Sequence, residues 1–199
     1  MTIKNTIFHT FGEQVFNRPL FYTYHGGLRF ELSEGGTMLE QFLRALTKAN
    51  EICQAIFHDN QSIMVCLRTL QQPNIFAYRT VLTELALAGI RIPKSHEYWI
   101  DRDMEDTELA WLTVAFEIPV NLLKNILWCA LATDFGSIRP NPHCAVYLFD
   151  CDKQIMAFPY DDRGMDVVGK NHQRLTELYH KFNHYLLDYD RKTMQATFE

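Results

Sequence analysis

The sequence lacks the patterns that mark membrane-spanning, secreted and disulfide-stabilised proteins. No run of eighteen apolar residues occurs, and the first sixteen residues hold no apolar stretch long enough for a signal peptide. The five cysteines form an odd set without a CxxC pair, and four of them lie in apolar runs, as reduced core cysteines do. We therefore expect a protein of the reducing cytoplasm, with no membrane segment.

The motifs of common catalytic and cofactor sites are also missing. Only four serines occur, none in a GxSxG motif, and neither GxGxxG, GxxxxGK[ST] nor HExxH is present. Cys66 and Cys129 would have raised thiol pKa values if buried, which would make them poor nucleophiles. Zinc held by Cys144, Cys151 and a histidine is a weaker alternative, because no second cysteine pair accompanies this six-residue gap. The sequence predicts no catalytic residue, no metal and no cofactor.

The charge balance disfavours partners that are themselves anionic. Apolar residues make up 47% of the 199 residues and charged residues 22%, as in globular domains. The net charge of −5 repels nucleic acid and anionic membranes. Fourteen Phe, nine Tyr and three Trp could stack on bases, but core packing or a protein interface suits them better. No linker or repeat divides the chain, so we predict one domain over residues 1–199.

Hydrophobic periodicity predicts a mixture of hairpins and helices. Helices are expected at 37–57, 75–88 and 119–132, and a last helix begins after Asn171. Extended segments are expected at 21–27, 28–32, 62–67, 97–101, 110–118, 145–149, 154–158 and 165–168. Because regular βαβ alternation is absent, we predict an α+β fold with a mainly antiparallel sheet and about four helices packed on it.

Residues 37–57 give the clearest helical signal. Thr37 and Glu40 have the spacing of a capping box at its start. One stripe at 100° per residue contains the predicted core residues Leu39, Phe42, Leu43, Leu46, Cys53, Ile56 and Phe57.

The densest polar feature is the run YDDRGMD at 160–166, followed by LDYDR at 187–191. Paired carboxylates beside an arginine could perform acid–base chemistry or hold a divalent cation. However, an adjacent arginine favours the charged carboxylate, whereas a general acid needs a raised pKa. We therefore favour a tight turn in which Gly164 supplies a positive φ and aspartates cap backbone amides. The Asp–Arg pairs would then tie this turn to the end of the last helix.

Arg29 and Glu31 lie two residues apart on a strand and so share one face, opposite Leu28, Phe30 and Leu32. If a helix covers that face, Arg29 needs a carboxylate partner, for which the Asp161–Asp162 turn is a candidate. The alternative is a solvated face with a weak ion pair.

Several of these motifs together resemble a known family. The runs FGSIRPNPHCAVYLFDCDKQIMAFPYDDRGMDVV, LTELYHKFNHYLLDYDR and PLFYTYHGGLRFEL resemble the bacterial family catalogued as domain of unknown function 3885. The resemblance implies no established activity, and Gly164 is among the matching positions. The matching charged residues are our candidate binding residues: Arg29, Glu31, Asp161, Asp162, Arg163, Asp166, Asp188, Asp190 and Arg191.

Two functional hypotheses follow from these observations. The first is a non-catalytic protein-binding module, in its sharper form an immunity-type antitoxin that neutralises a basic toxin. Its contact points would be the acidic stretch 101–108 and the Asp161–Asp162 turn. The second is an enzyme for a small molecule or phosphate ester, in which arginines 29, 163 and 191 bind an anion and Asp162 or Asp166 orients water or a metal.

Overall fold

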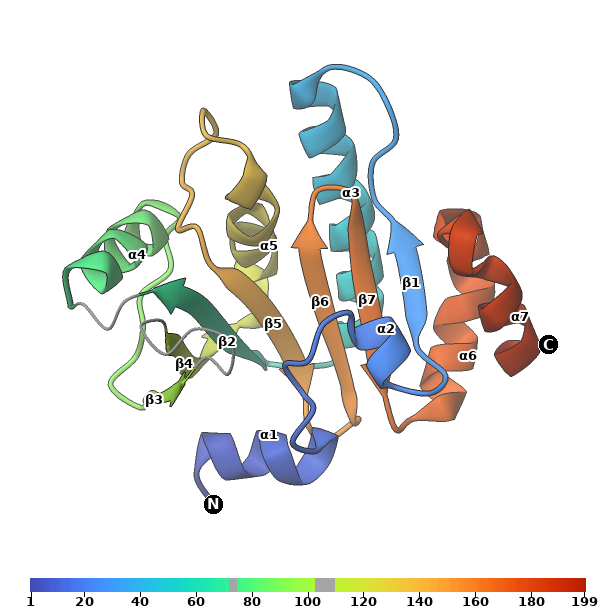
Figure 1. Ribbon diagram of the computed structural model, residues 1–199, viewed down its shortest axis with the longest axis horizontal. Helices are drawn as coiled ribbons and strands as arrows, with labels where there is room; N and C mark the ends of the chain where they lie inside the picture. The colour runs from blue at the N-terminus through green and yellow to red at the C-terminus, as the bar shows by residue number, and fades with distance from the viewer. Residues whose placement is uncertain (72–74, 103–109) are drawn as a thin grey trace.

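A computed structural model describes residues 1–71, 75–102 and 110–199 of the chain. In these ranges seven strands form one antiparallel sheet in the order β1-β7-β6-β5-β2-β4-β3 (Figure 1). The strands are β1 (Leu28–Glu31), β2 (Ser62–Gln71), β3 (Glu97–Arg102), β4 (Ala110–Pro119), β5 (Ala145–Asp150), β6 (Ile155–Asp161) and β7 (Gly164–Gly169). The predicted α+β class and antiparallel sheet are confirmed.

The helices are more numerous than the sequence predicted. The described residues form seven α-helices: α1 (Ile3–Phe11), α2 (Leu20–Thr23), α3 (Met38–Phe57), α4 (Ile75–Leu87), α5 (Leu123–Leu131), α6 (His172–Lys181) and α7 (Arg191–Phe198). Four short 3-10 turns accompany them: η1 (Val120–Leu122), η2 (Ala132–Asp134), η3 (Asn183–Tyr185) and η4 (Asp188–Asp190). Within the described ranges, no helix combines the length and apolarity needed to cross a membrane.

Of the three unpredicted helices α1, α2 and α7, the first two are short and depend on contacts that are distant in sequence. The sequence predicts an extended segment at 21–27, but residues 20–23 form α2 instead. The amide of Phe21 in this helix donates to the Asp166 carboxylate on β7. Two amides in the first turn of α1 likewise donate to the Glu97 carboxylate on β3. Helices this short are marginal alone, so tertiary contacts decide whether they form.

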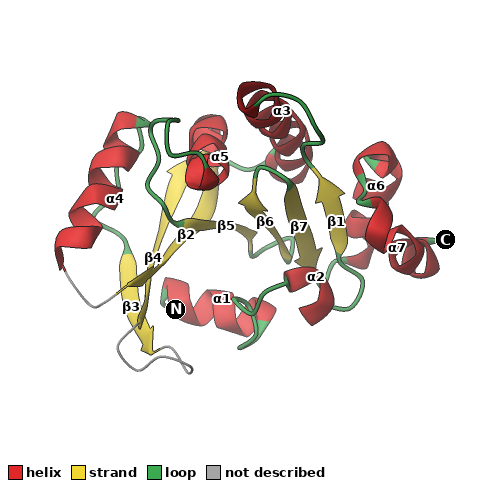
Figure 2. Ribbon diagram, turned by 45° about the horizontal axis from the view of Figure 1, so that its top comes forward, coloured by secondary structure: helices red, strands yellow, loops and turns green. Residues whose placement is uncertain are grey.

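Both faces of the sheet are covered (Figure 2). Helices α3, α4, α5, α6 and α7 contribute to a core on one face, which includes Leu28 and Phe30 of β1. Helices α1 and α2 contribute to a second core on the other face, around Tyr147, Phe149 and Phe158. Burial on both faces explains why β5 and β6 read as continuous apolar runs rather than alternating ones.

Helix α3 confirms most of its predicted pattern. The Thr37 hydroxyl accepts from the Glu40 amide, and the Glu40 carboxylate accepts from the Thr37 amide, which completes the capping box. Two members of the predicted core stripe are exposed, however: Leu39 at 61% and Leu43 at 48%. The first turns of α3 rise past the ends of β6 and β7, so the stripe there has no sheet to pack on (Figure 1).

Candidate functional site

Three of the candidate residues meet beneath α2. Arg29 of β1 and Asp166 of β7 are directly opposed in the antiparallel register, so the sheet itself brings them together. Arg29 Nε lies 2.8 Å from Asp166 Oδ1, and Arg29 Nη1 lies 3.2 Å from Asp190 Oδ2. Both aspartates are buried, with exposures of 1% and 4%. The carboxylate partners of Arg29 are therefore Asp166 and Asp190, rather than the predicted Asp161–Asp162 turn.

Helix α2 covers this ion-pair network. The Asp166 carboxylate also accepts from the Phe21 amide, at 3.1 Å, and the Tyr22 hydroxyl donates to Asp190 Oδ1 at 2.8 Å. The Arg29 guanidinium lies 4.9 Å from the centre of the Tyr22 ring. Each carboxylate thus has several donors, which is the condition for keeping charges inside a protein.

The pKa shifts agree with a closed network. Burial raises the pKa of Asp166 above its ordinary value, although the Arg29 bonds oppose that rise. Burial alone would lower the pKa of Arg29, but its bonds to Asp166 and Asp190 raise it. The Tyr22 pKa is raised chiefly by its hydrogen bond to Asp190. Arg29 therefore remains charged and bound to its carboxylates, which suits a structural role better than proton transfer.

The turn between β6 and β7 forms a separate unit. The Asp161 carboxylate accepts from the Arg163 amide at 2.8 Å and from the Arg163 guanidinium. This confirms the predicted capping of a backbone amide. The predicted reason for Gly164 is wrong, because its φ is not positive. Glycine is needed there because the Tyr160 hydroxyl would lie 1.8 Å from an added Cβ.

The remaining candidates lie apart from the Arg29 network. Asp162 accepts from the Ser33 hydroxyl at 3.2 Å, and burial raises its pKa. Asp188 pairs with Arg191 at 2.8 Å on the surface, while Arg191 also donates to Asn183. Glu31 is half-buried. Of the predicted contact stretch 101–108, residues 103–108 lie outside the described residues.

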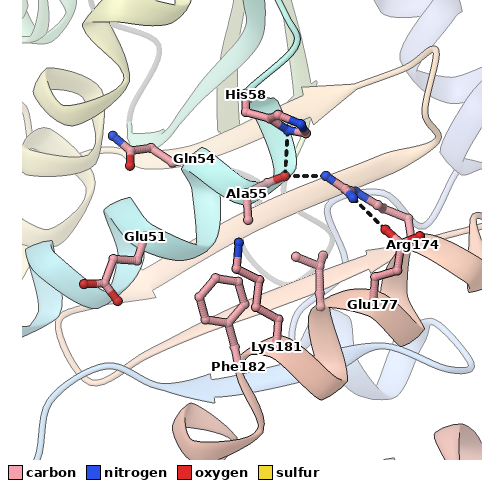
Figure 3. Close-up of a pocket in the computed structure, with 9 residues that line it drawn as sticks. Glu51, Gln54, Ala55, His58, Arg174, Glu177, Lys181 and Phe182 are labelled. Atoms are coloured by element: carbon pink, nitrogen blue, oxygen red, sulfur yellow. Dashed lines mark hydrogen bonds and ion pairs between the residues drawn. The ribbon is translucent and has the colours of Figure 1, made fainter.

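The structure has hollows that the sequence reasoning did not find. We consider three in the described part of the chain, and none of these three is lined by any of the nine candidate residues. The one shown in Figure 3 is a groove of about 570 Å³ between the last turns of α3 and helix α6. We call it the α3–α6 groove; its lining residues are Glu51, Gln54, Ala55, His58, Arg174, Glu177, Leu178, Lys181 and Phe182.

The α3–α6 groove combines apolar and charged side chains. Arg174 donates to the Ala55 carbonyl and, at 2.6 Å, to the Glu177 carboxylate, so it ties α6 to the end of α3 (Figure 3). The buried Arg174 Nε has no hydrogen-bond partner within the described ranges. Lys181 has no carboxylate partner among them either, and its Nζ lies 5.3 Å from the Phe182 ring centre. The exposed Lys181 ammonium therefore remains available for an acceptor from outside the chain.

Charged residues of opposite sign spaced three or four apart on α6 are the sequence signal for this groove. Arg174, Glu177 and Lys181 follow that spacing, but the same pattern is typical of an ordinary solvated face. Only the position of α3 turns it into one wall of a groove.

Metal and thiol chemistry find little support in the described residues. No group of three or more His, Cys, Asp or Glu side chains there could hold a metal ion. All five cysteines are free, and burial raises the pKa of the Cys129 thiol to about 12. The predicted poor nucleophilicity of buried Cys66 and Cys129 is consistent with these raised pKa values.

Comparison with known proteins gives a family but no activity. No curated protein and no solved structure matches the chain significantly. The family model described as domain of unknown function (DUF3885) matches residues 3–190, which is nearly the whole chain. The protein therefore belongs to the family of the domain of unknown function DUF3885.

Proposed function

We propose that this protein is a non-catalytic protein-binding module whose partner docks in the α3–α6 groove. The observation that carries the proposal is the composition of that groove. Ala55, Leu178 and Phe182 supply an apolar lining, while the charged side chains around them include Lys181 and Arg174. An apolar lining with a few polar groups is typical of sites that bind a side chain or a small ligand.

The occupant that fits is a peptide segment with an apolar side chain next to a carboxylate. The apolar part would cover Phe182 and Leu178, and the carboxylate would accept from the exposed Lys181 Nζ. Charge complementarity between the carboxylate and Lys181 would orient the segment.

The overall charge of the partner is a separate matter from this local contact. With −5 net charge, the protein attracts a partner that is basic overall, because complementary fields speed association. The sharper form of the proposal is an immunity-type antitoxin for a basic toxin. Cells that carry the gene for such a toxin should lose viability when this protein is deleted, and survival would contradict the antitoxin form.

The enzyme alternative receives less support from the geometry. Its central residues, Arg29, Asp166 and Asp190, bind one another beneath α2 and line none of the three hollows considered above. An arginine that is already bonded to two carboxylates has little capacity left for a substrate anion.

The test is affinity capture from an extract of the host cells with a matched pair of variants. Lys181→Glu reverses a charge in the groove, whereas Lys124→Glu makes the same change on the exposed side of α5. We expect a stoichiometric partner with the unmodified protein and with Lys124→Glu, and at least a tenfold loss with Lys181→Glu. Equal capture by both variants, or no partner at all, would contradict the proposal.

A further inference from the structure

Two arginines converge on one tyrosine on the opposite face of the sheet from the groove. Arg18, from the segment between α1 and α2, donates its Nε–H to the Tyr147 hydroxyl at 3.0 Å. Arg68 of β2 interacts electrostatically with the same hydroxyl. Tyr147 of β5 is fully buried, whereas Arg18 is exposed. The cluster therefore reaches from the second core to the surface.

Among the described residues of this cluster, hydrogen-bond donors outnumber acceptors. Because the Tyr147 oxygen accepts from Arg18, its own O–H must find another acceptor, and none occurs among the described residues. Arg68 Nε donates to the Thr113 hydroxyl at 3.0 Å, and Nη2 lies 3.5 Å from the Asp101 carboxylate. That same Asp101 oxygen also accepts from Trp99. The Asp101 carboxylate is thus shared between the Arg68 guanidinium and the Trp99 indole.

Burial makes this imbalance significant. The Arg68 side chain is only 8% exposed, whereas its ion-pair partner Asp101 is 38% exposed and lies 3.5 Å away, farther than Asp166 lies from Arg29. Burial lowers the pKa of Arg68, and the neighbouring positive charge of Arg18 lowers it further. A buried cation is normally matched by a carboxylate at bonding distance, as Arg29 is.

Aromatic rings hold both guanidiniums in place. The Arg68 guanidinium lies 4.3 Å from the centre of the Phe16 ring and 4.7 Å from that of Trp111. The Arg18 guanidinium lies 4.8 Å from the centre of the Phe158 ring, which is itself stacked on Tyr147 at 4.2 Å. Stacking covers the faces of a guanidinium and leaves its N–H edge available for hydrogen bonds. The donors are thus positioned before any ligand arrives.

We propose that Arg18, Arg68 and Tyr147 form a binding site for an oxyanion group, the phosphate or carboxylate of a small molecule. Two guanidiniums match such a group in charge and geometry, and the Tyr147 O–H supplies a further donor. Phe16, Trp111 and Phe158 would contact the adjoining part of the molecule. This site is independent of the groove and of the proposed protein partner.

Calorimetric titration with inorganic phosphate, pyrophosphate and citrate tests the site, with sodium chloride at matched ionic strength as a control. We expect the unmodified protein to bind at least one of the three anions, and the preferred one separates a phosphate from a carboxylate ligand. Binding of none, or an equal response to chloride, would overturn the proposal.

Variants then assign the binding to these residues. Arg18→Gln should raise the dissociation constant of the anion at least tenfold. The variant should still fold, because Arg18 is exposed. Tyr147→Phe should raise the dissociation constant several-fold, since this variant keeps the stacked ring and removes only the hydroxyl. Arg91→Gln, the same change at another exposed arginine, should bind as the unmodified protein does. Equal affinity of Arg18→Gln and Arg91→Gln would contradict the assignment.

Discussion

Arg29 illustrates how much a single residue depends on the whole sheet. Its position opposite Asp166 is fixed by the β1–β7 register, and Asp190 arrives from a segment that follows α6. The need of a buried Arg29 for a carboxylate follows from the sequence and elementary electrostatics. The identity of that carboxylate does not, because neighbours across strands depend on the pairing of segments more than a hundred residues apart.

Removing the Asp166 carboxylate should strongly destabilise the fold. Asp166→Ala leaves Arg29 buried with only Asp190 as a partner, so we expect urea denaturation to show a loss of about 3–5 kcal/mol. Arg163→Ala is the control: its side chain is 73% exposed, and its pairing with Asp161 should contribute less than about 1 kcal/mol. Similar losses for both variants would mean that the Arg29 network does not stabilise the fold.

Asp162 should make stability depend on pH. Burial raises its pKa in the folded state, so the charged form is disfavoured there and its contribution to stability falls as pH rises through that pKa. Asp162→Asn keeps an oxygen acceptor for Ser33 and removes the charge. The variant should therefore melt at a higher temperature than the unmodified protein at pH 8, and the difference should shrink as pH falls towards about 4. A difference that grows on acidification would show that the charged form is favoured.

At the scale of elements, the helices that could be predicted from the sequence are those that local interactions stabilise. The α3 helix has its own capping box and a long apolar stripe, and both are visible in the sequence. Helices α1 and α2 depend on Glu97 and Asp166, which are distant in sequence. A signal for α1 did exist: Thr2 caps it, and Ile3, Ile7 and Phe11 recur at helical spacing.

A side chain at position 164 should destabilise the β6–β7 hairpin. Gly164→Ala places a Cβ on the Tyr160 hydroxyl and should lower the free energy of unfolding by about 1–3 kcal/mol. Gly136→Ala, where no atom lies within 4 Å of the added Cβ, is the matched control. In a double-mutant cycle, Tyr160→Ala should reduce the loss caused by Gly164→Ala. If the losses in unfolding free energy of the two substitutions simply add, contact with Tyr160 is not the cause of the loss at position 164.

At the scale of the whole molecule, the two-sided core should protect the thiols. Cys53, Cys66, Cys129 and Cys144 are buried, and burial also raises the pKa of the half-buried Cys151 thiol, to about 11. Titration with a thiol reagent at pH 8 should find at most one reactive cysteine in the native protein, Cys151, and five in denaturant. Rapid reaction of several thiols in the native protein would contradict the burial of the four core cysteines.

The candidate residues predicted from sequence and the groove found in the structure make opposite predictions for partner binding. Asp161 and Asp162 are buried and bonded within the fold, whereas Lys181 is exposed in the groove. The most direct test is therefore to compare partner capture by Asp161→Asn/Asp162→Asn with capture by Lys181→Glu, after circular dichroism has shown that both are folded. Our account predicts that the aspartate variant retains the partner and that Lys181→Glu loses it. Loss with the aspartate variant and retention by Lys181→Glu would contradict our account.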